Sequence, residues 1–196
     1  MIFTMITPAL MKLGYTKVRN SFYISHDGNW GIINFQLSQK SGFSQKLFTV
    51  NVGIASKRIL AFLGFQTSNR KPGIWDTQFR MRLGHLLPEN KDVWWSLDQD
   101  TNIESMGRFI QDLVVIYALP TVEKYIADES LRDLWMTGNS PSLTEIERLL
   151  YLSVLVQQIG PIEILEPTIK ELERQTSRKP SAIMAEVFIK KLKGFQ

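Results

Sequence analysis

Polar side chains that can bind an anion recur at alternate positions of three segments of this sequence. Asn34 and Gln36 are two residues apart, Asn51 lies within FTVNVGI, and Arg80 and Arg82 are again two residues apart. Because side chains of an extended strand point alternately to its two faces, each such pair shares a face. Amide and guanidinium groups offer directional donors that bind carboxylate, phosphate or peptide backbone groups. The sequence therefore predicts a polar binding surface, provided that these segments are neighbouring strands.

Four runs of alternating hydrophobic and polar side chains predict the strands that position these groups. They cover residues 21–26, 30–38, 45–54 and 79–83. Asp27-Gly28 joins the first two runs and is a preferred pair for a two-residue hairpin turn, because both turn positions need a positive φ. We expect one antiparallel sheet, with its hydrophobic side chains facing helices and its polar side chains on the outer face.

Most of the remaining chain has helical periodicity. A short helix is predicted to open at Thr7-Pro8, and helical spacing runs from Asn102 almost to the end of the chain. The sequence therefore predicts an α+β fold: a four-stranded antiparallel sheet covered by helices, followed by an all-helical C-terminal appendage. We place the α+β domain at residues 1–127 and the helical appendage, packed on it, at residues 128–196.

Composition excludes several classes of protein. The 196 residues include no cysteine, which excludes a disulfide framework, a thiolate metal site and a cysteine nucleophile. This absence fits a reducing cytoplasm, where we expect the protein to work. Lys12 follows the apolar N-terminal run, which is the wrong order for a secretory signal. No apolar run reaches the length of about 18 residues that a membrane helix needs, so we expect no membrane partner.

The positive charge lies in the first half of the chain. Residues 1–100 hold 12 Lys and Arg against 6 Asp and Glu, although the whole chain carries only +4. Such a bias favours an anionic partner. It also has a plain alternative, a solvated surface, and no dense Lys/Arg run indicates a nucleic acid as partner.

The polar strand face likewise has two interpretations. Alternation alone produces a solvated outer face in any antiparallel sheet that is covered on one side. Asn and Gln, however, are unfavourable at central strand positions, so Asn34, Gln36 and Asn51 carry a local cost that folding does not require. The adjacent pair Trp94-Trp95 cannot point the same way in extended chain. We expect one of the two to anchor the core and the other either to cover the sheet or to stand at its rim.

Familiar catalytic motifs are absent from the sequence. It contains no phosphate loop, no GxGxxG, no HExxH and no nucleophile elbow. Its two histidines, His26 and His85, fall at a turn and at a strand end, and Asp98 and Asp100 precede a helix, where acidic residues commonly cap or face the helix dipole. We therefore assign no catalytic residue, no metal ligand and no cofactor.

Several ordered motifs resemble one family. They are Leu13-Gly14-Tyr15, Asn34-Phe35-Gln36, Phe48-Thr49-Val50-Asn51, Arg82-Leu83-Gly84 and Trp94-Trp95. This series is similar to the bacterial family known as domain of unknown function 4304, from around residue 8 either to residue 127 or, through the following helix pair, to residue 176. Tyr15 stands where that family usually has Phe. The resemblance implies an α+β fold and implies no activity.

The favoured hypothesis is a cytoplasmic binding or interaction protein whose polar sheet face holds a protein partner or an anionic small molecule. Its predicted ligand-binding residues are Asn34, Gln36, Asn51, Arg80, Arg82, Trp94 and Trp95. The alternative is an enzyme that acts on a phosphorylated or nucleic-acid substrate. It would need a general base, for which the candidates are His26, His85, Asp98 and Asp100. The oligomeric state stays open.

Overall fold

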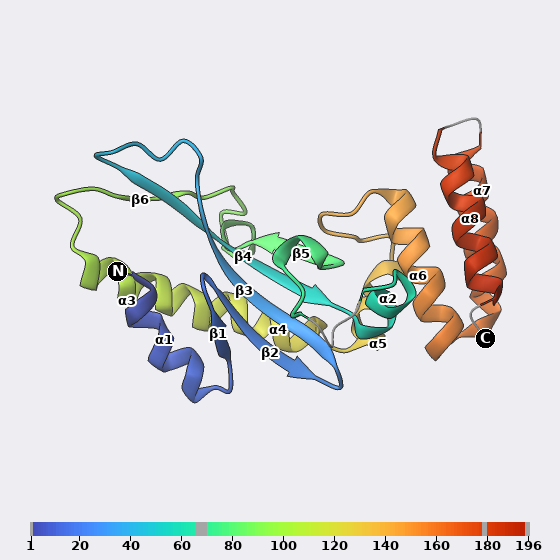
Figure 1. Cartoon of the computed structure of the whole chain (residues 1–196), viewed down its shortest axis with the longest axis horizontal. Coiled ribbons are helices and arrows are strands. Elements are labelled where there is room, and N and C mark those ends of the chain that lie inside the picture. Colours follow the sequence, from blue (N-terminus) through green and yellow to red (C-terminus); the bar gives the residue numbers. More distant parts are fainter. Residues whose placement is uncertain (1, 66–69, 178–179, 195–196) are drawn as a thin grey trace.

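The computed structural model describes residues 2–65, 70–177 and 180–194. It confirms an α+β fold in which helices cover one face of an antiparallel sheet and further helices stack at one end (Figure 1). The strands are β1 (Thr16–Val18), β2 (Ser21–His26), β3 (Asn29–Leu37), β4 (Lys46–Ala55), β5 (Phe79–Arg82) and β6 (Trp95–Leu97). They are ordered β1-β2-β3-β4-β5, and β6 pairs with the early part of β4.

The sheet has two more strands than the sequence predicted. All three side chains of β1 are exposed, so this strand shows no alternation and exists through its backbone pairing with β2. The other addition, β6, is three residues long, too short for a pattern to be visible. Both lie next to longer strands that do show alternation.

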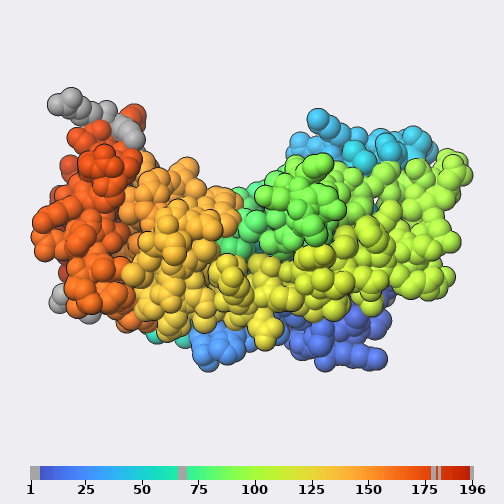
Figure 2. Space-filling view, turned by 180° about the vertical axis from the view of Figure 1, so that it is seen from behind, coloured from blue at the N-terminus to red at the C-terminus, as the bar shows by residue number. Residues whose placement is uncertain are grey.

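The apolar face of the sheet is covered by α1 (Ile2–Lys12), α3 (Ile103–Leu113) and α4 (Leu119–Tyr125). Figure 2 shows α3 and α4 as a continuous band across the back of the molecule. Gly31 lets α4 approach β3 closely, because a Cβ there would lie 2.4 Å from Cγ1 of Val122. The first helix begins at Ile2 rather than at Thr7, and Pro8 lies inside it.

A π-helical segment, Val114–Ala118, joins α3 to α4 without a break in the chain direction. Pro120 follows it and has no N–H to donate to the carbonyl four residues earlier, Ile116. A wider turn before a proline lets the helix absorb that missing hydrogen bond. The helix therefore continues through Pro120.

The helical segment comprises α5 (Asp128–Met136), α6 (Glu145–Ile159), α7 (Leu165–Thr176) and α8 (Ser181–Gly194). It shares one hydrophobic cluster with the sheet, because Trp135 and Leu192 belong to the same cluster as Phe22 and Ile33. The short helix α2 (Lys57–Phe62) lies beside α6 (Figure 1). This shared packing fixes α5–α8 against the sheet domain.

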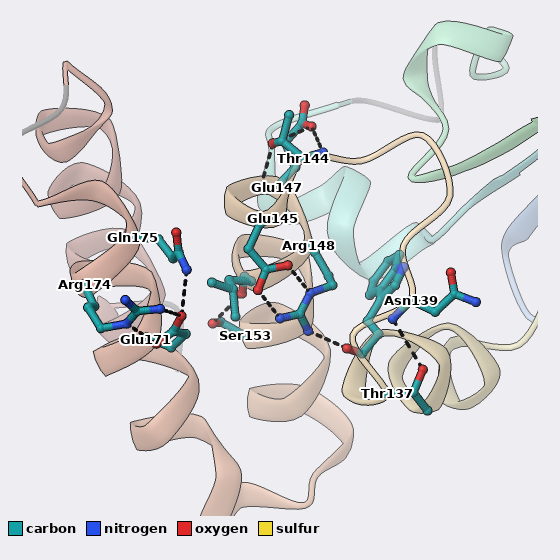
Figure 3. A network of polar contacts seen from close by, with 12 residues as sticks. Thr137, Asn139, Thr144, Glu145, Glu147, Arg148, Ser153, Glu171, Arg174 and Gln175 are labelled. Atoms are coloured by element: carbon teal, nitrogen blue, oxygen red, sulfur yellow. Dashed lines mark hydrogen bonds and ion pairs between the residues drawn. The ribbon is translucent and has the colours of Figure 1, made fainter.

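Two ion pairs of the helical segment, Arg148–Glu145 in α6 and Arg174–Glu171 in α7, each lie within one helix (Figure 3). Arg148 is 8% exposed, and its guanidinium donates to both carboxylate oxygens of Glu145 and to the carbonyl of Trp135. The start of α6 is fixed by a capping box between Thr144 and Glu147. In the sequence, Ser142 and Glu145 have the same Ser/Thr-x-x-Glu spacing, which predicts a capping box two residues earlier. Ser142 instead has a φ of 63°, outside helical geometry.

Candidate functional site

One polar row crosses four strands of the sheet. Directly paired residues place Ser21, Asn34, Asn51 and Arg82 side by side on β2, β3, β4 and β5. The next row holds Tyr23, Ile32, Gly53 and Arg80. Gln36 lies two residues beyond Asn34 and therefore on the same face. The five strand residues predicted to share the outer face are thus brought together.

The amides of this row hydrogen-bond to one another and to Ser21. Asn34 donates to Oγ of Ser21 at 2.8 Å, and Nδ2 of Asn51 contacts Oδ1 of Asn34 at 3.3 Å and Oε1 of Gln36 at 3.0 Å. Asn34 is 7% exposed and Asn51 is 3% exposed. Buried polar groups are stable where they find such partners, so these hydrogen bonds offset the unfavourable strand propensity of Asn and Gln.

Short segments cover both ends of the outer face. At one end, Ile74 of the single-turn helix η1 (Ile74–Asp76) packs on Tyr23 and Ile32. At the other end, Thr49 is fully buried and donates to the carbonyl of Val93 at 2.9 Å. The outer face is therefore covered at both ends and is not an open, flat sheet.

Two grooves remain on this outer face, and Trp75 of η1 lines both. The first has a volume of about 420 Å³ and is lined by Asn51, Trp75, Arg80, Met81, Arg82, His85, Pro141 and Ser142. We call it the arginine groove. The second, the amide groove, has a volume of about 710 Å³ and is lined by Val18, Arg19, Asn20, Ser21, Tyr23, Asn34, Gln36, Leu37, Gln39, Gly73, Ile74 and Trp75. The predicted residues therefore fall into two neighbouring grooves rather than one.

The linings of both grooves contain cations and no carboxylate. The arginine groove carries the cations Arg80 and Arg82 as well as His85, and the amide groove carries Arg19. A third cleft, at the β2–β3 turn, has the opposite character, because three carboxylates line it beside its cations. Those lining residues include His26, Asp27, Lys57, Arg58, Asp128 and Glu129. A lining of one charge sign focuses the field on a ligand of the other sign.

Arg80 is a cation of the arginine groove whose charge no ion pair balances among the described residues. Its guanidinium carbon lies 4.6 Å from the ring centroid of Trp75, and its Nη1 lies 3.5 Å from the carbonyl of Ile74. Within the described part of the chain, no carboxylate forms an ion pair with it. Burial lowers the pKa of Arg80; Glu147 opposes this shift and Arg82 adds to it. An arginine stays charged at neutral pH even so, and its charge remains available in the groove.

Arg82 is held more firmly from its side of the groove. Its guanidinium forms an ion pair with Asp92 and lies 4.9 Å from the ring centroid of Trp94. Trp94 stands at the rim and lines neither groove. Trp95 packs with Phe48 in the hydrophobic core, at 5.7 Å between ring centroids. The pair therefore divides as expected, and Trp95 does not face the grooves because it is buried on the apolar side of the sheet.

Comparison with known families matches this part of the molecule. The model of one family, described as Domain of unknown function (DUF4304), matches residues 6–124. The chain belongs to the DUF4304 family. The matched region contains the whole sheet, with the helices that cover its apolar face and nearly all of the lining of both grooves. No curated protein and no solved structure matches the chain.

The arginine groove also has a wall from outside the DUF4304 region. Pro141 and Ser142 belong to the linker between α5 and α6, and they line the groove opposite residues of β5. Glu147, at the start of α6, is near enough to act on the pKa of Arg80. The segment that follows the family match therefore helps to shape the candidate site.

Trp75, Arg19 and Ser142 are lining residues that the sequence argument missed. Trp75 follows Pro72-Gly73 in residues 66–78, a stretch whose Pro-Gly pair and weak periodicity predict a loop. Residues 66–69 of this stretch lie outside the described chain. The sequence did contain a hint that Trp75 is exposed, because a tryptophan in a turn-rich loop belongs to no strand or helix pattern that would place it in the core. Arg19 and Ser142 gave no signal, since only the folded backbone brings them to the sheet face.

The remaining candidates for chemistry lie apart from one another. His85 lines the arginine groove and its Nδ1 contacts Oδ1 of Asn90 at 3.1 Å, whereas His26 lines the cleft at the β2–β3 turn. Asp98 accepts from Thr101 at 2.6 Å in an exposed turn. Across the described residues, no group of three His, Cys, Asp or Glu side chains is placed to hold a metal ion. Nor is any described helix long and apolar enough to cross a membrane.

Proposed function

We propose that this DUF4304 protein binds an anionic ligand on the polar face of its sheet. The observation that carries the proposal is the lining of the two grooves, which includes three arginines and a histidine but no carboxylate. The chain contains 19 Asp and Glu, so their absence from both linings is a feature of the site and not of the composition.

The chemistry of Arg80 favours an anion over an uncharged partner strand. Its charge is partly removed from water and unpaired by the described carboxylates, an arrangement that costs free energy unless a ligand balances it. A guanidinium matches carboxylate and phosphate with two parallel hydrogen bonds. Arg82, fixed by Asp92 and Trp94, supplies a second donor in the same groove.

We place this binding protein in the bacterial cytoplasm. The support is the absence of cysteine, which suits a reducing compartment, together with the resemblance of its motifs to a bacterial family. A protein partner is the other occupant that the polar face suits, and an acidic surface of such a partner would use the same arginines.

Calorimetric titration with inorganic phosphate and pyrophosphate tests the proposal. Wild-type protein should bind pyrophosphate saturably, and Arg80→Gln should weaken binding by about tenfold to a hundredfold, the effect of losing a hydrogen bond to a charged group. Arg108→Gln is the matched control, because Arg108 is an exposed arginine paired with Glu104 on α3, and it should bind as the wild type does. Equal binding by both variants, or no saturable binding at millimolar pyrophosphate, would contradict the proposal.

An enzyme acting on a phosphorylated or nucleic-acid substrate is the second candidate. Its support is His85, which lines the arginine groove beside Arg82 and is the one general base among the lining residues. Phosphorus NMR of the same titrations distinguishes the two, because an enzyme converts its ligand during the experiment and a binding protein returns it unchanged.

A further inference from the structure

Trp75 is an exposed ring on a firmly held turn. It is 68% exposed, although its neighbour Ile74 is buried against the sheet. The turn is fixed by a hydrogen bond from Thr77 Oγ1 to the carbonyl of Ile74 at 2.7 Å, and by one from the N–H of Gly73 to Oδ2 of Asp76 at 2.7 Å. The side chain of Trp75 therefore does not serve the core, yet its position is well defined.

The close fit under η1 depends on a glycine in β4. A Cβ at Gly53 would lie 2.7 Å from Cδ1 of Ile74 and 2.8 Å from Cγ2 of Thr77. The turn can rest directly on the sheet because Gly53 has no side chain. This contact places Trp75 at the boundary between the two grooves.

The Trp75 ring is 68% exposed, so it offers surface on which a ligand can stack. Arg80, which lines only the arginine groove, stacks on the ring, and no other ring or cation of the described residues does so. The same tryptophan also lines the amide groove. A planar ring is the ligand group that gains most from such a platform, because stacking on an aromatic side chain buries both faces in contact.

The amide groove can read the edge of a planar heteroaromatic ring. Asn20, Asn34 and Gln36 line it, but both polar groups of Asn34 are already hydrogen-bonded within the sheet and Nδ2 of Asn20 donates to the carbonyl of Phe35 at 2.6 Å, so the groups that face a ligand come from Asn20 Oδ1 and Gln36. Oε1 of Gln36 accepts from Asn51, which leaves its Nε2 without a hydrogen-bond partner among the described residues. Nucleobases present donors and acceptors side by side on their edges, and proteins recognise them by stacking together with such hydrogen bonds.

We propose that the anion held on this face is a nucleoside monophosphate. The base stacks on Trp75 above the amide groove, and the phosphate lies between Arg80 and Arg82. The volumes of about 420 and 710 Å³ lie in the range of sites for small ligands. This inference rests on the proposed function and specifies the class of ligand that the same site takes.

Calorimetry with matched ligands separates the ring from the phosphate. AMP, GMP, CMP and UMP are compared with ribose 5-phosphate, which carries the anion without a base. At least one nucleotide should bind about tenfold more tightly than ribose 5-phosphate, a gain that base–aromatic stacking supplies. Trp75→Ala should remove that difference while it keeps ribose 5-phosphate binding, and Trp75→Phe should retain most of it.

Phe109→Ala is the control, because Phe109 is a half-exposed ring on α3 and lines neither groove. Circular dichroism and a thermal melt establish that each variant is folded. Equal binding of ribose 5-phosphate and all four nucleotides would overturn the inference and leave the anion site standing. A Trp75→Ala variant that weakens every ligand alike would also overturn it, since Trp75 would then act only by holding Arg80. Failure of every phosphate compound to bind would overturn the proposed function itself.

Discussion

Arg148 in the helical segment is buried and Arg80 on the sheet is half-buried, but only Arg148 has an acidic partner that balances its charge. Arg148 is almost fully buried and is surrounded by acceptors: two carboxylate oxygens of Glu145 and the carbonyl of Trp135 (Figure 3). The hydrogen bond with Glu145 raises the pKa of Arg148. Arg80 has an aromatic ring and one distant carbonyl, and burial lowers its pKa.

The difference shows how a fold separates a structural cation from one available for binding. A helix supplies Arg148 with its partner from its own sequence, three residues earlier, so that the pair forms whenever α6 forms. A strand supplies no such neighbour, because residues two apart on one face are both arginine at positions 80 and 82. The remaining charge on the sheet can therefore be balanced by a ligand.

The sharpest test of this comparison is stability. Arg148→Ala should lower the free energy of unfolding by about 2–3 kcal/mol, because it leaves the carbonyl of Trp135 without its donor and Glu145 without its partner. A loss of that size lowers the melting temperature by about 2–4 °C for each kcal/mol. Arg80→Gln should change stability by no more than about 0.5 kcal/mol.

Urea unfolding of both variants measures these changes, with Arg174→Ala as the control for an exposed pair on α7. If Arg80→Gln is as destabilising as Arg148→Ala, Arg80 also stabilises the fold, and the proposed difference between the two arginines is wrong.

A second test divides the polar face itself. Asn51→Ala should cost about 1–2 kcal/mol, because Oδ1 of Asn34 and Oε1 of Gln36 lose their shared donor in a buried row. Gln36→Ala should cost less, since Gln36 is only half-buried and water can replace its contact. Chemical denaturation of the two variants measures the difference. Equal losses would mean that the amide ladder does not stabilise the sheet.

The smallest expected effect is on the loss of stability at acidic pH. The hydrogen bond from Arg148 lowers the pKa of Glu145 in the folded state. Stability from this pair is therefore complete above the ordinary glutamate pKa and is lost as the pH falls through the lowered folded value. Glu145→Gln should flatten the fall of melting temperature between about pH 5 and pH 3. The change should be small because Glu145 is half-exposed. An unaltered slope would mean that the pair contributes little.

Sequence periodicity was enough to predict which polar residues share the outer face, but not which hydrogen bonds they form. Alternation in β3 and β4, with the Asp27-Gly28 turn, placed Asn34, Gln36 and Asn51 on one face, because a one-residue slip would expose the apolar set. Their mutual hydrogen bonds were not visible, since they depend on the register between strands.

Hydrophobic periodicity did not predict the positions of residues that are placed by tertiary contacts. The placement of Trp75 depends on η1 resting on Gly53, a contact between residues that are far apart in β4 and the following loop. The start of α6 moved to Thr144 because two overlapping capping boxes were possible, and the backbone at Ser142 decided between them. Such choices are made by packing, which a single sequence does not display.

The linker between α5 and α6 forms one wall of the arginine groove and is separate in sequence from the two arginines that line it. Pro141 and Ser142 come from beyond residue 124, where the family match ends, whereas the two arginines come from within it. A change in the linker would therefore reshape this wall of the arginine groove and leave Arg80 and Arg82 in place on β5.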